Sequence, residues 1–234
     1  MLKIGNAAHF RRTVAGLCLL AAPLVFAAAE ITQQPSGSAA AQLASYAQHR
    51  DQLLAALLLG IASSMLFVPA LFGLLHQIRE RGVVYAHVAA AMIIYGVVAV
   101  AALWGVNATF WVMVKPGMNR SAMVTLLNGI EHAPAVGAPL LAGHYLFALG
   151  VVLLGVAVWR ARLAPRWAGI LVVLFPVADV VLSPIGDVPS ALISSAIGLV
   201  GFGALGLRML TTSDAAWDQV PEISPEPVRQ PSAI

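Results

Sequence analysis

The sequence predicts an all-α fold, a polytopic transmembrane bundle of about six spanning helices. Hydrophobic residues make up 60% of the 234 residues and charged residues 10%, whereas a soluble domain is about 45–50% apolar and about 25% charged. The apolar residues are gathered into runs of about 18 or more, which is the length a helix needs to cross the hydrocarbon core of a bilayer. These runs occupy most of the chain, so we expect one membrane domain and no separate soluble domain.

Six apolar runs follow a basic head at residues 1–12. The first run also has features of a secretory signal, because Ala27-Ala28-Ala29 resembles a small-residue cleavage site. We favour a retained helix over a cleaved signal, since a retained helix gives an even number of spans. The expected spans cover residues 13–30, 53–75, 83–105, 138–159, 167–185 and 189–210.

The segments outside these runs are more polar. Residues 32–50 contain a stretch with helical composition, and residues 106–136 form the longest connection, an outer loop with an interfacial helix. We expect Ser121 to cap that helix, Asn128-Gly129 to end it, and the aromatic residues beside it to lie at the membrane interface. Residues 211–234 are rich in proline and lack apolar periodicity, which predicts a disordered tail.

The distribution of lysine and arginine predicts the orientation. With the N-terminus in the cytoplasm, ten of the 13 basic residues fall on the cytoplasmic side and Arg50, Lys115 and Arg120 on the outer side. Cytoplasmic loops are enriched in these residues. The sequence therefore predicts cytoplasmic N- and C-termini in a multi-pass protein of the plasma (inner) membrane. The ten are Lys3, Arg11, Arg12, Arg79, Arg81, Arg160, Arg162, Arg166, Arg208 and Arg229.

Two ionisable residues interrupt the fourth and fifth runs. His144 and Asp179 each lie roughly 9 Å inside the outer boundary of their spans, at about 1.5 Å of rise per residue. Ionisable groups inside a membrane usually face a partner or a water-filled cavity. Because the two spans are joined by a short turn, we expect them to be adjacent and the two side chains to approach each other.

Glu131, His132 and Asp187 lie just above this pair on the same side, and all five residues are candidates for an outer-leaflet polar pocket. The pocket would bind a small ligand, or the pair would only brace the bundle. A small ion- or proton-coupled transporter is an alternative. A membrane-embedded hydrolase is another, with zinc held by His132, His144 and Asp179.

Metal and enzyme signals in the sequence are weak. No HExxH motif is present. The single cysteine, Cys18, lies inside an apolar run, so a cysteine-built metal site is excluded. We therefore predict no cofactor and lean against an enzyme.

The expected partners follow from the same features. The main partner is the lipid bilayer, and nucleic acid is not expected because the basic residues lie in short turns. The sixth run is rich in glycine, which favours close helix packing and would suit a homo-oligomer contact. Its glycines are Gly198, Gly201, Gly203 and Gly206.

Four short features of the chain stand out together: Arg11-Arg12-Thr13-Val14-Ala15-Gly16 entering the first helix, His144 at the head of the fourth, the turn Arg160-Ala161-Arg162-Leu163-Ala164-Pro165-Arg166, and Gly169 in the next helix. With these features the chain resembles a family of small six-helix bacterial membrane proteins of unknown function, common in actinobacteria. The resemblance covers residues 11–210. It implies the six-helix architecture and no particular reaction.

Overall fold

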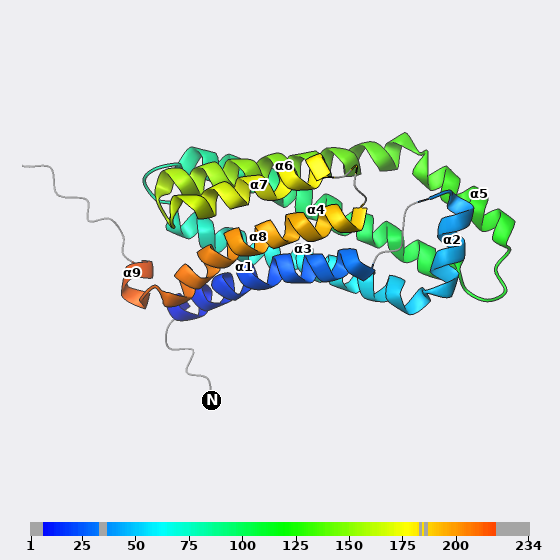
Figure 1. The fold of residues 1–234 in the computed structure, drawn as a ribbon, viewed down its shortest axis with the longest axis horizontal. Coiled ribbons are helices and arrows are strands. Elements are labelled where there is room, and N and C mark those ends of the chain that lie inside the picture. Colours follow the sequence, from blue (N-terminus) through cyan, green and yellow to red (C-terminus); the bar gives the residue numbers. More distant parts are fainter. Residues whose placement is uncertain (1–6, 33–36, 183, 185–186, 219–234) are drawn as a thin grey trace, which may run out of the picture.

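The computed structural model describes residues 7–32, 37–182, 184 and 187–218, and within these ranges nine α-helices make up the fold (Figure 1). Six long helices run along the long axis of the molecule and three short ones lie at its two ends. In chain order they are α1 (Ala7–Thr32), α2 (Ala39–Gln48), α3 (Arg50–Gln77), α4 (Val83–Met113), α5 (Arg120–Glu131), α6 (Pro134–Ala161), α7 (Arg166–Leu182), α8 (Asp187–Thr211) and α9 (Asp214–Asp218).

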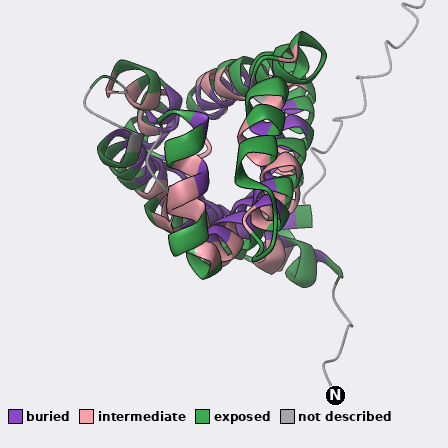
Figure 2. Ribbon diagram, turned by 90° about the vertical axis from the view of Figure 1, so that its right-hand side faces the viewer, coloured by how far each residue is buried: buried purple, intermediate pink, exposed green. Residues whose placement is uncertain are grey.

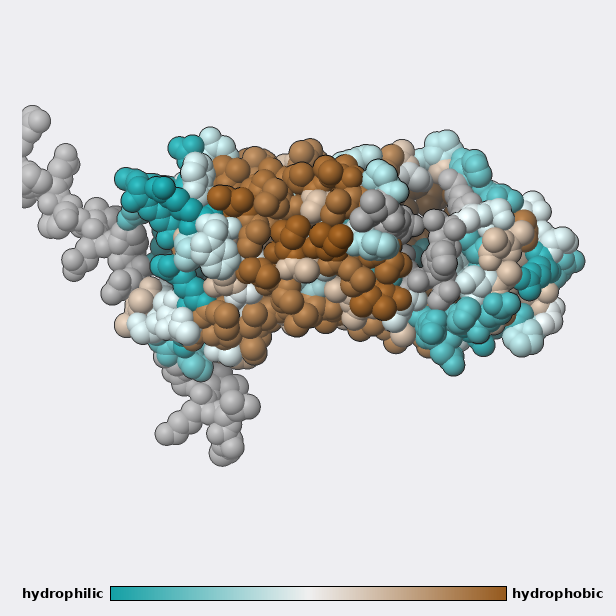
Figure 3. All heavy atoms as spheres, viewed as in Figure 1, coloured by the Kyte–Doolittle hydropathy of each residue, from teal (hydrophilic) through white to brown (hydrophobic). Residues whose placement is uncertain are grey.

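Five of the long helices are long and apolar enough to cross a membrane: α1, α3, α4, α6 and α8. The surface agrees, because a hydrophobic belt lies between two hydrophilic ends (Figure 3). The chain is therefore a multi-pass α-helical membrane protein. Helix α7 has 17 residues, which corresponds to about 25 Å at 1.5 Å per residue.

The six long helices pack into a closed ring in the order α1, α3, α4, α6, α7, α8, and α8 returns to pack against α1. Each helix thus contacts the next long helix along the chain, because elements consecutive in the sequence are usually adjacent in space. Figure 2 shows the ring from the end that carries α2 and α5. Among the six long helices, α1 and α8 are the pair farthest apart in the sequence, and their contact closes the ring.

Small residues form the seams of this ring. A Cβ atom at Gly206 of α8 would lie 2.7 Å from the carbonyl oxygen of Gly16 on α1, and a Cβ atom at Gly155 of α6 would lie 2.8 Å from that of Gly169 on α7. Backbones approach this closely only where side chains are absent, which is the usual packing between membrane helices. The glycines of α8 pack against α1 and α7 of the same chain. The homo-oligomer expected from these glycines stays a prediction.

At the end of the ring where α1 begins, the interior is tightly packed. Leu19, Leu74, Ile93, Val151 and Phe202 are all at most 2% exposed. They come from five different helices and surround a gap of only about 10 Å³. This half of the bundle is therefore solid.

The opposite end is covered by α2 and α5, which share a small apolar cluster with the ends of α3 and α4. Tyr46 of α2 stacks on Phe110 of α4 at 5.8 Å between ring centroids. Arg50 lies 3.9 Å above the ring of Trp111. Phe110 is 7% exposed, because α4 extends to Met113 and carries it into this cluster. The expected position of the aromatic residues at the membrane interface stays a prediction.

The interfacial helix exists as α5, but its limits differ from those expected. Asn119 is the N-cap, and its side-chain oxygen accepts a hydrogen bond from the backbone of Ala122 at 3.2 Å. Ser121 is already inside the helix and donates its hydroxyl to Asn119 at 2.8 Å. The helix also continues past Gly129 to Glu131, since an exposed glycine weakens a helix without ending it.

The expected disordered tail contains structure at its start, since α8 continues to Thr211 and α9 follows. Trp217 of α9 is 2% exposed. Its carbonyl oxygen accepts a hydrogen bond from Arg79 at 2.8 Å, and Nε2 of His76 lies 3.0 Å from the same oxygen. Helix α9 is thus attached to the end of α3, a contact that the local composition of the tail does not encode. The rest of the tail, residues 219–234, lies outside the described residues.

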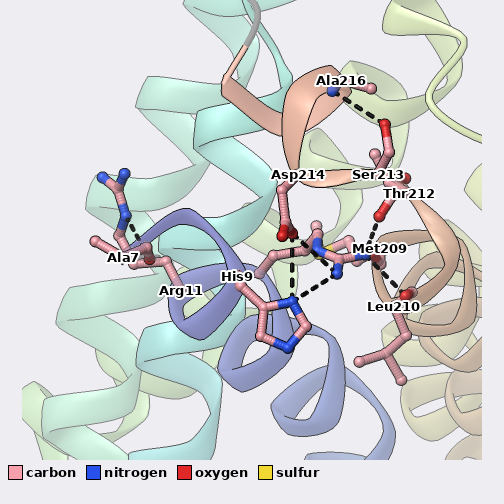
Figure 4. A network of polar contacts seen from close by, with 10 residues as sticks. Ala7, His9, Arg11, Met209, Leu210, Thr212, Ser213, Asp214 and Ala216 are labelled. Atoms are coloured by element: carbon pink, nitrogen blue, oxygen red, sulfur yellow. Dashed lines mark hydrogen bonds and ion pairs between the residues drawn. The ribbon is translucent and has the colours of Figure 1, made fainter. Parts of the chain in front are cut away.

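Arg12 links α1, α8 and α9. Figure 4 labels its partners Met209, Leu210, Thr212 and Asp214. Its guanidinium donates to the carbonyl oxygens of Leu210 at 2.9 Å, of Met209 at 3.3 Å and of Thr212. It also pairs with Asp214 at 3.1 Å. The last carbonyls of a helix have no partner within the helix and carry partial negative charge, so a buried arginine satisfies them well.

Candidate functional site: a cavity inside the helix ring

A cavity of about 370 Å³ lies inside the ring, in the half nearer α2 and α5. All six long helices contribute to its wall, so it exists only because the ring closes. Its volume is in the range of small-molecule sites. The lining residues are Phe26, Glu30, Ser63, Ser64, Phe67, Val97, Val100, Leu103, Trp104, Asn107, His144, Phe147, Ala148, Phe175, Pro176, Asp179, Val180, Ser190 and Ala191.

Aromatic rings form the floor of this cavity. Phe202 contacts both Phe67 and Phe175 edge to face, with ring centroids 5.9 Å and 6.1 Å apart. Phe147 and Phe26 extend the group at 5.4 and 6.4 Å. Phe67 and Phe202 also border the small gap on the packed side. The floor therefore separates the cavity from the solid half of the bundle.

Asp179 is part of the wall, as a half-buried side chain on α7. The hydroxyl oxygen of Ser194, on α8, lies 3.3 Å from its carboxylate and 3.1 Å from the carbonyl oxygen of Ala191, where it can donate to either. Pro176, one turn earlier, also lines the cavity. It has no N–H to donate, which leaves the carbonyl of Val172 without its helical partner.

His144 lines the same cavity from α6. Its imidazole contacts the neighbouring ring of Tyr145, with centroids 5.9 Å apart. His144 and Asp179 both belong to the described residues, and neither a hydrogen bond nor an ion pair joins them. The structure thus brings the two residues to one cavity and gives Asp179 a different partner, Ser194.

Sequence reasoning missed several polar residues of the wall. Glu30 near the end of α1, Asn107 on α4, and Ser63 and Ser64 on α3 face the cavity. Glu30 could have been recognised from the sequence, because it is an acidic residue at the end of an apolar run. We used it only as the last residue of the first expected span, 13–30. Trp104 also lines this wall and is 4% exposed. Gly60 provides the space for its indole ring.

Apart from His144, the ionisable residues that line the cavity are acidic. Two carboxylates, Glu30 and Asp179, line it, and no lysine or arginine lines it within the described part of the chain. Aromatic rings and serine hydroxyls make up much of the remaining surface. Aromatic faces attract cations, and a carboxylate in a partly dry site attracts them more strongly.

The other expected site residues lie elsewhere or outside the description. His132 is exposed at the end of α5, where its Nδ1 lies 2.8 Å from the carbonyl oxygen of Asn128. The side chains of Glu131 and Asp187 lie outside the described residues. Over the described ranges, no three His, Cys, Asp or Glu side chains come together to hold a metal ion. The set of His132, His144 and Asp179 is therefore not assembled.

No protein-family model, no curated protein and no solved structure matches this chain. The class of protein therefore follows from its own fold and cavity.

Proposed function

We propose that the chain is a ligand-binding protein of the plasma membrane that holds a small organic cation in the cavity inside its helix ring. The observation that carries the proposal is that two carboxylates, those of Glu30 and Asp179, and several aromatic side chains line the same cavity of about 370 Å³. Such an arrangement offers a charge partner for an ammonium group and a surface for its apolar part.

The cost of keeping carboxylates inside a membrane bundle supports this proposal. An acidic side chain at membrane depth is expensive, and it is usually found where it has a function. The Asp179 carboxylate accepts a hydrogen bond from Ser194 at 3.3 Å. This bond orients the carboxylate but supplies no positive charge. A bound cation would provide a counter-charge for this carboxylate.

The proposed topology has six spans with both ends in the cytoplasm, so that the cavity is nearer the outer face. It is supported by the position of α7 in the ring between α6 and α8, and by the arginines at the turns near α9. Cysteine labelling tests it in a Cys18→Ser background. We expect an impermeant maleimide added to intact spheroplasts to label Gly117→Cys and not Arg162→Cys; the reverse pattern would invert the topology.

Ligand binding is tested with ethidium, a fluorescent aromatic cation, titrated onto the detergent-purified protein. We expect saturable binding that Asp179→Asn and Glu30→Gln each weaken by at least about tenfold, equivalent to about 1.4 kcal/mol. Glu80→Gln is the matched control, because it removes a carboxylate at the opposite end of the bundle. It should leave the affinity unchanged.

Two results would refute the proposal. One is ethidium binding that Glu80→Gln weakens as much as Asp179→Asn does, which would indicate a general charge effect. The other is no saturable binding by any of several cations of this size (ethidium, tetraethylammonium and tetraphenylphosphonium) to a protein that elutes as a single species. The variants must keep the unfolding temperature of the wild type for the comparison to be valid.

A transporter that works through the same cavity is the second candidate. Pro69 and Pro176 lie inside the continuous helices α3 and α7, beside the floor residues Phe67 and Phe175. Each proline removes one hydrogen-bond donor of its helix, and helices weakened at a binding site would suit a transporter. Ion-driven uptake of ethidium into proteoliposomes, lost in Asp179→Asn, would favour this candidate. Binding without uptake would favour the binding protein.

A further inference from the structure

We propose a second site, at the opposite end of the bundle, that binds the phosphate headgroup of an anionic phospholipid. An open pocket of about 660 Å³ lies where the α3–α4 turn meets the α6–α7 turn. Four arginines and one acidic residue line it, together with Trp159 and Gly82. The charged residues are Glu80, Arg81, Arg160, Arg162 and Arg166.

The arginines of this pocket keep their charge available. None of them forms an ion pair with another residue in the described part of the chain. Arg160 lies over the ring of Tyr85, 5.2 Å from its centroid. Several guanidinium groups around one pocket suit a phosphate, which they contact through paired N–H donors.

The backbone holds the pocket in shape. Gly82 has a φ of 85°, in the left-handed region, and a Cβ atom there would lie 2.9 Å from the carbonyl oxygen of Ala157 on α6. The α3–α4 turn therefore rests directly on α6. Arg162 also adopts a left-handed conformation, φ 54°, where it ends α6 and begins the next turn. The arginines thus come from two turns that are fixed against each other.

The surroundings favour a lipid over a free phosphate ion. Trp159 and Trp167 are each 48% exposed, Tyr85 is 41% exposed, and Ile170 is 52% exposed one turn further along α7. Tryptophan and tyrosine at the end of membrane helices mark the level of the headgroups. An apolar surface that continues from the pocket provides a place for acyl chains, and basic pockets between membrane helices bind anionic headgroups.

Fluorescent phosphatidylglycerol titrated onto the purified full-length protein in detergent micelles tests the site. Each arginine near a membrane surface contributes about fivefold in affinity, so Arg160→Gln/Arg166→Gln should weaken binding by about 25-fold. Arg120→Gln, an exposed arginine of α5 at the other end, should leave it unchanged. Arg162→Gln, expected to weaken binding about fivefold, replaces the double variant if that one does not fold.

A second pair of variants tests the shape of the pocket with all arginines retained. Gly82→Ala should displace the turn from α6 and weaken phosphatidylglycerol binding severalfold. Gly117→Ala is the control, because Gly117 has a similar φ of 88° and nothing within 4 Å of its Cβ position. Both substitutions impose the same backbone strain, so a difference between them reports the contact with α6.

Three outcomes would overturn the proposal. If the wild type and the arginine variants bind phosphatidylglycerol equally well, the arginines set only the orientation of the protein in the membrane and do not bind the lipid. Equal binding of fluorescent phosphatidylcholine would remove the charge argument. Displacement of the lipid by inorganic phosphate at millimolar concentration, with equal thermal stabilisation by phosphate alone, would assign the site to free phosphate.

Discussion

Closure of the helix ring depends on the contact between Gly206 and Gly16, and Gly206→Ala tests it. A Cβ atom at position 206 would lie 2.7 Å from the Gly16 carbonyl oxygen, and ordinary contact begins at 3.4 Å. Helix α8 must therefore move by about 0.7 Å away from α1, against backbone that cannot yield. Overpacking of this kind costs about 1–3 kcal/mol.

Gly203→Ala is the matched control, one turn earlier on the same helix. A Cβ atom there meets only the end of the Leu20 side chain, at 3.6 Å. Both variants gain about 1 kcal/mol of helix propensity, so the difference between them isolates the contact. At about 3 °C per kcal/mol, a difference of about 2 kcal/mol puts Gly206→Ala about 6 °C below Gly203→Ala.

Thermal unfolding in detergent, followed by tryptophan fluorescence, measures this difference. Size-exclusion chromatography before each scan ensures that only monodisperse protein is compared. If Gly206→Ala unfolds at the same temperature as Gly203→Ala or above it, α1 and α8 do not meet as described and the closed ring is wrong.

Three further variants test the interior and the attachment of α9, each by the same unfolding assay unless stated. Arg12→Gln should lower the free energy of unfolding by about 2 kcal/mol, because buried carbonyl oxygens lose their hydrogen-bond donor. Arg11→Gln, at an exposed position, should change this free energy little. Equal effects of the two variants would contradict the buried network. Phe67→Ala in the cavity floor should cost about 3–5 kcal/mol, and Phe72→Ala on the outer face of the same helix much less; a similar loss would contradict the floor. Trp217→Ala should speed amide hydrogen exchange in residues 214–218 while leaving the ring protected, and unchanged exchange would contradict the docking of α9.

The candidate site could be anticipated only in part. An ionisable residue in an apolar run signals a polar interior, and for this reason His144 and Asp179 were found. Their mutual contact was not predictable, because a helix turns by 100° per residue and a small rotation decides which neighbour a side chain meets. In the structure, the rotation of α7 places the Asp179 carboxylate beside the hydroxyl of Ser194. Glu30 joins the same cavity because α1 lies in the ring beside α3 and α8.

The ends of several helices in the structure also differ from the ends expected from the sequence. The expected spans are shorter than the helices except for α7, since an apolar run can end while backbone hydrogen bonding continues. Helix α4 runs eight residues past position 105, to Met113, for this reason. The cap of α5 moved from Ser121 to Asn119 because both side chains can accept a backbone hydrogen bond and only the three-dimensional course of the loop selects one.

The sequence by itself determined that this protein is a helical membrane protein, since the length and composition of a helix that crosses a bilayer are properties of single segments. It also located the polar residues that a membrane interior must accommodate. Tertiary structure alone decided that α8 returns to α1, that six helices enclose one cavity, and that Arg12 and Trp217 attach α9 to the bundle. These are contacts between residues distant in the sequence. Their free energy depends on how closely two backbones approach, which no single segment encodes.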